Sequence, residues 1–167
     1  MQVPGFEDLD RIEAAYLEQP SMPTLGQSYE LMLTRWLQGQ RGRELALRLL
    51  FLYWYSRSEP TGFTGLGNVS YSQILLAQIA SELDVDRSSD LEVCFVLDIM
   101  ANVWPEAFGA DEAFWTATGE RARAVLGAKN QSVDPEIFTG RGAYGEYFKH
   151  QATIALEHEL RAGVNTH

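Results

Sequence analysis

Two stretches of this chain are apolar around the whole circumference of a helix, and they restrict the fold more than any other feature. The first runs from Leu45 to Tyr55 (LALRLLFLYWY) and the second from Leu91 to Trp104 (LEVCFVLDIMANVW). The length of the first stretch and its lack of flanking turn signals favour a helix, while valine and isoleucine between Val93 and Ile99 leave a strand open there. Because helices that are apolar on every side are normally enclosed by others, we expect both stretches at the centre of an all-α fold.

The segments around these two stretches have the spacing of amphipathic helices, with apolar residues recurring every three or four positions. The helices predicted in this way cover residues 6–16, 24–37, 70–83, 111–127 and 146–163. Pro20 and Pro23 end the first of them. We therefore predict a multi-helix bundle of about seven helices, with two enclosed central helices, in a single domain that spans residues 1–167.

Three helix starts are predicted from a serine or threonine that is followed three residues later by glutamate or glutamine. This capping-box pattern, in which the two side chains bond to backbone amides of the first turn, occurs at Thr24–Gln27, Ser70–Gln73 and Ser89–Glu92. In the second of these helices Tyr71 is predicted on the apolar face. The pattern therefore places the first turn of each helix from sequence alone.

The charge of the chain excludes some classes of partner. It has 23 acidic and 13 basic residues, a formal net charge of −10. Such a surface repels phosphate groups, so we expect neither nucleic-acid nor membrane binding, whereas it suits a basic protein partner. The longest apolar run is too short to span a bilayer, the first residues lack a secretory signal, and Cys94 has no second cysteine to pair with. These features predict a cytoplasmic protein.

The stretch GRGAYG, from Gly140 to Gly145, has the G-x-G-x-x-G spacing of a dinucleotide-binding turn. Such a turn needs a strand on each side of its helix. Pro135 disfavours a strand before it, and the chain leaves no room for one after the last helix. The favoured interpretation is a tight turn with positive φ at glycine; the alternative is a small-anion site in which Arg141 assists the helix amides.

Two polar groups stand out on apolar faces. Asp98 and Asn102 lie four positions apart in the middle of the second enclosed helix, and Arg48 in the first is a partner of the right type for Asp98. We predict an Asp98–Arg48 pair, which would orient a ligand if it lined a cavity; the alternative is a polar stripe that reaches solvent. His158 is predicted near the apolar face of the last helix, as a core-edge histidine or, alternatively, as a base at a pocket.

These observations favour a non-enzymatic protein-interaction module, an adaptor or an antitoxin- or immunity-like protein that binds a basic partner. No catalytic motif is present, and Glu146, His150 and Glu157 fall on a face expected to be solvated, so we predict no metal site and no cofactor. The alternative is a small-molecule binder or enzyme with a pocket around Asp98, Arg48 and His158. A third hypothesis is a homodimer, for which four Trp and seven Tyr would supply interface anchors.

Overall fold

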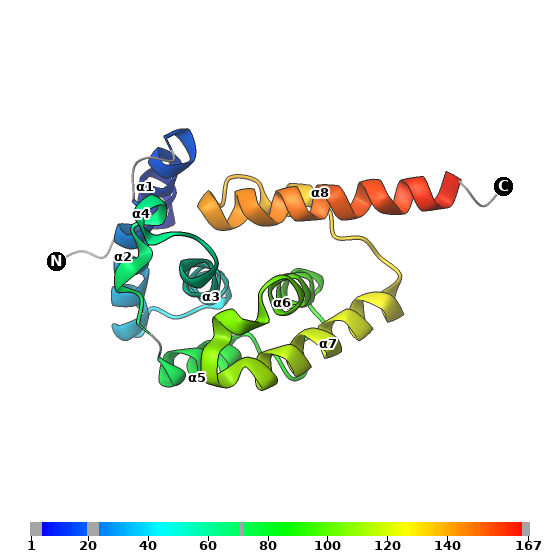
Figure 1. Ribbon diagram of the computed structural model, residues 1–167, viewed down its shortest axis with the longest axis horizontal. Helices are drawn as coiled ribbons and strands as arrows, with labels where there is room; N and C mark the ends of the chain where they lie inside the picture. The colour runs from blue at the N-terminus through cyan, green and yellow to red at the C-terminus, as the bar shows by residue number, and fades with distance from the viewer. Residues whose placement is uncertain (1–4, 20–23, 71, 165–167) are drawn as a thin grey trace.

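The computed structural model describes residues 5–19, 24–70 and 72–164, and within these ranges the protein is an all-α multi-helix bundle (Figure 1). Seven helices have ten residues or more: α1 (Phe6–Glu18), α2 (Leu25–Leu37), α3 (Arg43–Ser58), α5 (Gln73–Glu82), α6 (Leu91–Val103), α7 (Glu112–Lys129) and α8 (Gly142–Val164). The single turn α4 (Thr61–Thr64) and the 3₁₀ segments η1 (Leu66–Asn68), η2 (Pro105–Asp111) and η3 (Pro135–Phe138) connect them. The predicted fold class is confirmed.

Helices α3 and α6 lie at the centre, as their all-round apolar sequences predicted. Figure 1 shows both nearly end-on, with α1 and α2 on one side, α5 and α7 below and α8 above. Every residue of α3 from Leu45 to Trp54 is buried, and so is every residue of α6 from Glu92 to Leu97. Because neighbours cover these helices on all sides, two charged residues, Arg48 and Glu92, are carried into the interior with them.

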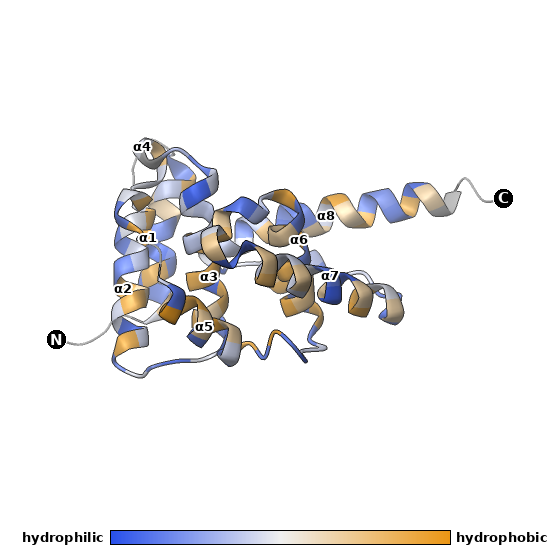
Figure 2. Cartoon of the chain, turned by 60° about the horizontal axis from the view of Figure 1, so that its bottom comes forward, coloured by the Kyte–Doolittle hydropathy of each residue, from blue (hydrophilic) through white to orange (hydrophobic). Residues whose placement is uncertain are grey.

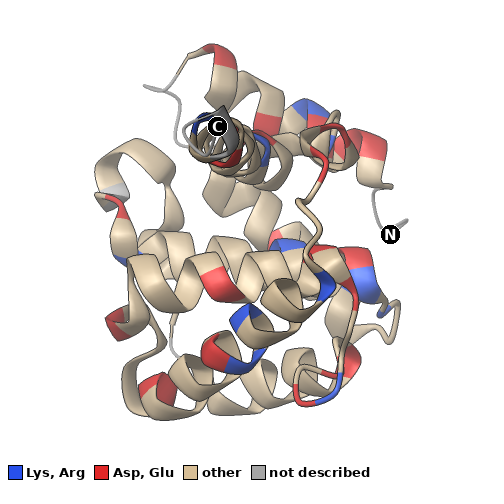
Figure 3. Cartoon of the chain, turned by 90° about the vertical axis from the view of Figure 1, so that its right-hand side faces the viewer, with Lys and Arg blue, Asp and Glu red and all other residues tan. Residues whose placement is uncertain are grey.

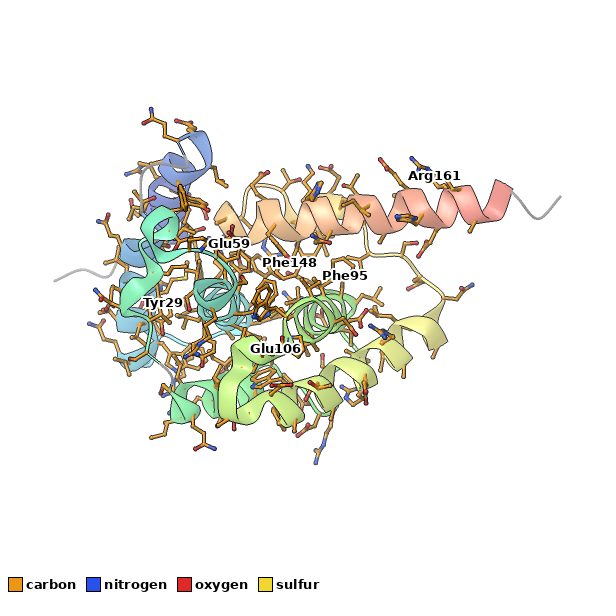
Figure 4. All side chains as sticks on the ribbon, in the orientation of Figure 1. Tyr29, Glu59, Phe95, Glu106, Phe148 and Arg161 are labelled. Carbon is orange, nitrogen blue, oxygen red and sulfur yellow. The ribbon has the colours of Figure 1, made fainter. Side chains whose placement is uncertain are left out.

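The outer helices are amphipathic, and Figure 2 shows hydrophilic and hydrophobic residues alternating along α1 and α2. In α2, for example, Tyr29, Met32 and Trp36 are buried at three- and four-residue spacing, whereas Leu37 is 72% exposed. Figure 4 shows the matching arrangement above α6, where Phe148 of α8 and Phe95 point toward one another. The ring centroids of these two residues are 6.4 Å apart.

The helix starts differ in detail from the capping boxes that the sequence predicted. The N-cap of α5 is Ser72, two residues after the predicted Ser70, and its side chain accepts a hydrogen bond from Leu75 N at 3.2 Å. The N-cap of α6 is Asp90 rather than Ser89, because the aspartate carboxylate accepts from Val93 N. The predictions made for Pro20, Pro23 and Tyr71 lie outside the described residues.

At the start of α2 the predicted threonine is the N-cap, but its side chain has another role. Thr24 makes no side-chain cap bond. Instead its hydroxyl donates to the carbonyl of Ile12 at 3.0 Å, which ties the start of α2 to α1. The capping pattern therefore located this helix start correctly while missing the contact that the threonine makes.

The last helix extends beyond the rest of the bundle. In α8 the buried residues end at Ala152, although the helix continues to Val164. Figures 1 and 2 show its outer part projecting past α6 and α7, and Figure 3 views the same helix nearly end-on from its C-terminal side. Figure 4 shows Arg161 pointing away from the molecule. Among the described residues no single helix is long and apolar enough for a membrane span; the pair Leu91–Val103 and Pro105–Lys129, bent by 94°, meets that criterion only when joined.

Candidate functional site

The GRGAYG turn leads the chain into α8 and encloses a carboxylate of the same chain. Gly140 and Gly142 have φ angles of 72° and 61°, in the left-handed region that glycine adopts without strain. A Cβ on Gly142 would lie 2.0 Å from Oε2 of Glu13. The amide of Ala143, in the first turn of α8, donates a 2.7 Å hydrogen bond to the same oxygen. The first turn of α8 thus contacts Glu13 of α1.

The carboxylate of Glu13 is almost completely removed from solvent, with 1% of the residue exposed. Ser28 of α2 donates its hydroxyl to the other carboxylate oxygen at 2.5 Å. Burial raises the pKa of Glu13, and the hydrogen bonds from Ser28 and Ala143 oppose that rise. Helix N-termini favour negative charge because their amides lack partners within the helix. The anion at this helix N-terminus is the carboxylate of Glu13 from the same chain, and Gly142 leaves room for it.

Arg141, the second residue of the turn, belongs to a set of ion pairs that joins α1, α3 and α6 to the start of α8. We call this set the α8 ion network; its members are Asp10, Arg43, Glu44, Arg48, Asp90, Glu92 and Arg141. Arg141 pairs with Glu44 and, at 2.5 Å, with Glu92. The hydroxyl of Tyr144 donates to the same Glu92 oxygen at 2.6 Å. The buried carboxylate of Glu92 is therefore fully partnered.

The other two arginines extend the network along α3. Arg48 pairs with Glu44 at 2.7 Å and with Asp10. Arg43 pairs with Glu92 at 2.6 Å and with Asp90 at 2.8 Å. Burial alone would raise the pKa of Glu44, but the hydrogen bonds from Arg141 and Arg48 outweigh it and lower that pKa. Arg48 thus joins α3 to α1, Arg43 joins α3 to α6, and Arg141 joins the start of α8 to both central helices.

The predicted pair between Asp98 and Arg48 is not formed, because the two side chains point to different parts of the fold. Arg48 faces α1, whereas Asp98 bonds to Arg123 of α7 at 2.9 Å and to Asn102 at 2.6 Å. Asn102 itself is exposed. A helix that is apolar all round has no polar face, so the spacing of its residues does not show where a single charged side chain points.

His158 is exposed instead of lying at the core edge. It belongs to the outer part of α8, beyond the last buried residue, Ala152. A cleft of about 350 Å³ does lie between α6, α7 and α8, and Asp98 and Arg123 are part of its lining, but Arg48 and His158 are not. Of the three residues predicted to form a shared pocket, only Asp98 lines this cleft, so the predicted pocket is not formed.

A second cleft, of about 560 Å³, lies between α5 and α7, and its lining was not identified from the sequence. We call it the acidic cleft. Trp115 and Phe114 line its α7 side with ring centroids 5.4 Å apart, and the three carboxylates in its lining are those of Asp84, Asp86 and Asp111. Trp115 is 2% exposed, because Phe108 stacks against it at 4.8 Å. Arg87 also belongs to the lining, so the cleft combines two aromatic rings with three carboxylates and one guanidinium group.

The turn that carries Asp84 and Asp86 is held in place by basic side chains that bond to its backbone. Arg121 donates to the carbonyl of Val85 at 3.1 Å and to that of Ser88 at 2.7 Å. Lys129 donates to the carbonyl of Ser89. Among the described residues neither Asp84 nor Asp86 takes part in an ion pair. Arg121 and Lys129 therefore fix the backbone of the turn without neutralising the carboxylates of Asp84 and Asp86.

Asp84 stands where glycine or asparagine is usual. It follows the C-cap of α5, Leu83, with a φ of 47°, and the amide of Val85 closes the turn on Ala80 O at 3.1 Å. A left-handed residue just after a helix is normally glycine, and the negative end of the helix dipole disfavours a carboxylate there. Unfavourable backbone positions of this kind concentrate at functional sites.

Comparison with models of protein families, with curated proteins and with solved structures gave no match for this chain. Its function therefore has to be inferred from its own residues. Among the described residues no three histidine, cysteine or acidic side chains form a group that could hold a metal ion.

One sequence signal could have pointed to the acidic cleft. The letters LDVDR directly follow the predicted apolar helix over 70–83, so two aspartates stand at a helix C-terminus. Cations, not anions, are favoured at that end of a helix. The contribution of Trp115 could not have been found in this way, because only the packing of α7 against α5 brings it beside the turn.

Proposed function

We propose that this protein is a non-enzymatic interaction module that binds a lysine or arginine side chain of a partner protein in the acidic cleft. One observation carries the proposal. Asp84 and Asp86 have no ion pair among the described residues, although Arg121 and Lys129 bond to the backbone of the same turn. A fixed pair of unneutralised carboxylates beside an aromatic wall favours a cationic occupant.

Lysine and arginine match the lining because they join a charged head to an apolar stem. The stem would lie along the ring of Phe114, which is 43% exposed, and the head would reach Asp84 or Asp86. The face of an aromatic ring also attracts a cation, by about 0.5–1 kcal/mol at exposed sites. A volume of about 560 Å³ is sufficient for more than one such side chain.

The charge of the whole chain supports the same class of partner. A net charge of −10 attracts a basic surface over distances of about a Debye length and speeds its encounter with the cleft. Because Arg121 and Lys129 already hold the turn, binding requires little further ordering of the cleft. Fast association and low ordering cost are what a protein that captures a basic partner needs.

The test is a titration of the full chain with a fluorescent arginine-rich peptide, followed by anisotropy at low and at physiological ionic strength. We expect saturable binding that weakens as salt rises. The double variant Asp84→Asn/Asp86→Asn removes two partly exposed charge contacts and should weaken binding about tenfold. Both positions are exposed, so the variant is expected to fold.

The matched control is Glu18→Gln/Glu157→Gln, which removes the same charge from exposed positions on α1 and α8. It should change the affinity less than about twofold if the cleft is the site. Equal weakening by the two double variants would mean that the peptide responds only to net charge, and the proposal would be wrong. Absence of saturable binding at low ionic strength would overturn it as well.

A further inference from the structure

A separate pocket lies between α1, α3 and the first turns of α8, on another side of the bundle from the acidic cleft. Its lining includes four aromatic side chains, from Tyr16, Phe51, Tyr55 and Tyr147, and its volume is about 260 Å³. We call it the aromatic pocket. Because that volume is below the range of about 300–1,000 Å³ usual for drug-sized ligands, it suits a small group.

Three of the rings form one continuous surface. Phe51 is 1% exposed, Tyr55 stacks on it with centroids 5.0 Å apart, and Tyr147 lies 5.5 Å from it at a tilted angle. Tyr16 approaches from α1, and its hydroxyl lies 3.4 Å from that of Tyr55. The three tyrosines are only partly buried. Ring surface from three helices therefore remains open around one small space.

The charges near the rings are negative. Glu146 and His150 line the pocket, and no lysine or arginine is among the described residues that do so. Glu59 lies close enough to raise the pKa of Tyr147 together with burial, which is the larger cause. Figure 4 shows Glu59 where α1, α3 and the start of α8 meet. Burial also raises the pKa of Tyr55.

We propose that the aromatic pocket binds a methylated ammonium group, either of a free quaternary amine or of a methylated lysine side chain. Aromatic rings attract a cation through their negative faces, and a methylated ammonium loses little hydration when it contacts them. Glu146 adds a carboxylate at the side of the rings and accounts for a preference for positive charge over a neutral group of the same shape. The site is distinct from the acidic cleft and does not depend on it.

The test compares choline with 3,3-dimethylbutan-1-ol, which has the same shape without the charge, by NMR of the full chain at pH 8, where an ordinary histidine is neutral. We expect the N-methyl resonance of choline to shift upfield, because ring currents act on protons over an aromatic face. We also expect choline to bind at least about tenfold more tightly than the alcohol. Equal binding of the two, or no saturable shift with choline, would overturn the proposal.

A second arm distinguishes the two sources of the ammonium group. A short peptide with trimethyllysine is compared with the same peptide carrying unmodified lysine. Tighter binding of the trimethyllysine peptide than of choline would assign the site to a protein ligand, and the reverse order would assign it to a free amine. If unmodified lysine bound as well as trimethyllysine, the proposed preference for the methylated group would be wrong.

Variants locate the site and separate it from a structural role. Glu146→Gln should weaken choline binding several-fold, whereas Glu157→Gln, an exposed position further along α8, should leave it within about twofold. Tyr16→Phe keeps the ring and should retain binding, while Tyr16→Leu should lose it. If Tyr16→Leu proved unstable in a thermal melt, the Glu146→Gln result would still decide. Asp84→Asn/Asp86→Asn should leave choline affinity unchanged, so either proposal can fail alone.

Discussion

In the α8 ion network three arginines bind four carboxylates. At the acidic cleft Arg121 and Lys129 bind backbone carbonyls, and two of the cleft's carboxylates have no ion pair among the described residues. The network reaches into the bundle at Arg48 and Glu92, which are buried and where an unpaired charge would cost several kcal/mol. The cleft faces solvent, where the same charge costs little. The difference separates charge that stabilises the fold from charge that is free for a partner.

The two regions also use glycine and aspartate differently at positive φ. At the network end of α8 the left-handed positions are Gly140 and Gly142, which adopt that conformation without strain. At the cleft the left-handed position after α5 is Asp84, which is less favourable there than glycine. A chain that places glycine in one turn and aspartate in the other is consistent with a structural role for the first and a binding role for the second.

The largest expected effect comes from breaking the network. Arg141→Met leaves Glu44 and Glu92 with one arginine fewer, and removal of one partner from a buried pair costs about 3–5 kcal/mol. Because each carboxylate keeps a second arginine, we expect a loss near the lower end, about 3 kcal/mol, in the free energy of urea-induced unfolding.

The matched control for Arg141→Met is Lys149→Met, which breaks the exposed pair with Glu136. It should cost less than about 1 kcal/mol. Losses of equal size in the two variants would show that the network contributes no more than a surface ion pair, and the contrast between the network and the cleft would fail.

A smaller effect is expected from the glycines. Gly142→Ala and Gly140→Ala both place a side chain at positive φ, which costs about 1–2 kcal/mol. Only at Gly142 would the new Cβ also meet Glu13, since nothing lies within 4 Å of a Cβ at Gly140. Moving the buried Glu13 carboxylate away from its partners should add about 1–3 kcal/mol. The measurement is the difference between the two unfolding free energies, and a difference near zero would contradict the contact.

The sequence predicted the parts of the fold that depend on patterns along one helix. The all-round apolar stretches of α3 and α6 identified the two central helices, and the starts of α2, α5 and α6 were placed within two residues. The last helix was predicted to start at residue 146, but α8 begins four residues earlier, at Gly142 inside the GRGAYG turn. Which side of a central helix faces which neighbour depends on packing. The direction of Arg48 toward α1 therefore could not be derived from its own helix.

The candidate sites were less accessible to sequence reasoning, because each combines residues from distant segments. The acidic cleft joins the turn after α5 to Trp115 of α7, and the aromatic pocket joins Tyr16 of α1 to Tyr147 of α8. His158 shows the opposite difficulty. Its helix keeps its spacing past Ala152, but none of the residues after Ala152 whose exposure is described is buried, so the pattern predicted burial where there is none.

The smallest expected effect comes from replacing one aspartate by asparagine, first in the α8 ion network and then in the acidic cleft. Asp90→Asn removes a charge that pairs with Arg43, whereas Asp84→Asn removes a charge that has no ion pair and lies at the unfavourable end of α5. We expect Asp90→Asn to lower the free energy of unfolding by about 0.5–1 kcal/mol and Asp84→Asn to raise it by about 0.3–1 kcal/mol. Thermal unfolding at neutral pH measures both changes. Changes of opposite sign would show that the carboxylate of Asp90 stabilises the fold and that the carboxylate of Asp84 does not.

The pH dependence makes that last comparison sharper. Burial raises the pKa of Asp90, but the hydrogen bonds from Arg43 and from the amide of Val93 outweigh it, so the folded-state pKa lies below the ordinary 3.8. A carboxylate with a lowered pKa contributes stability above its ordinary pKa and loses it as the pH falls through the folded value. The destabilisation by Asp90→Asn should therefore be full at pH 7 and shrink below about pH 4. If it were instead the same at both pH values, the ionised carboxylate would not be its source, because asparagine preserves the helix cap and only the lost charge makes the effect depend on pH.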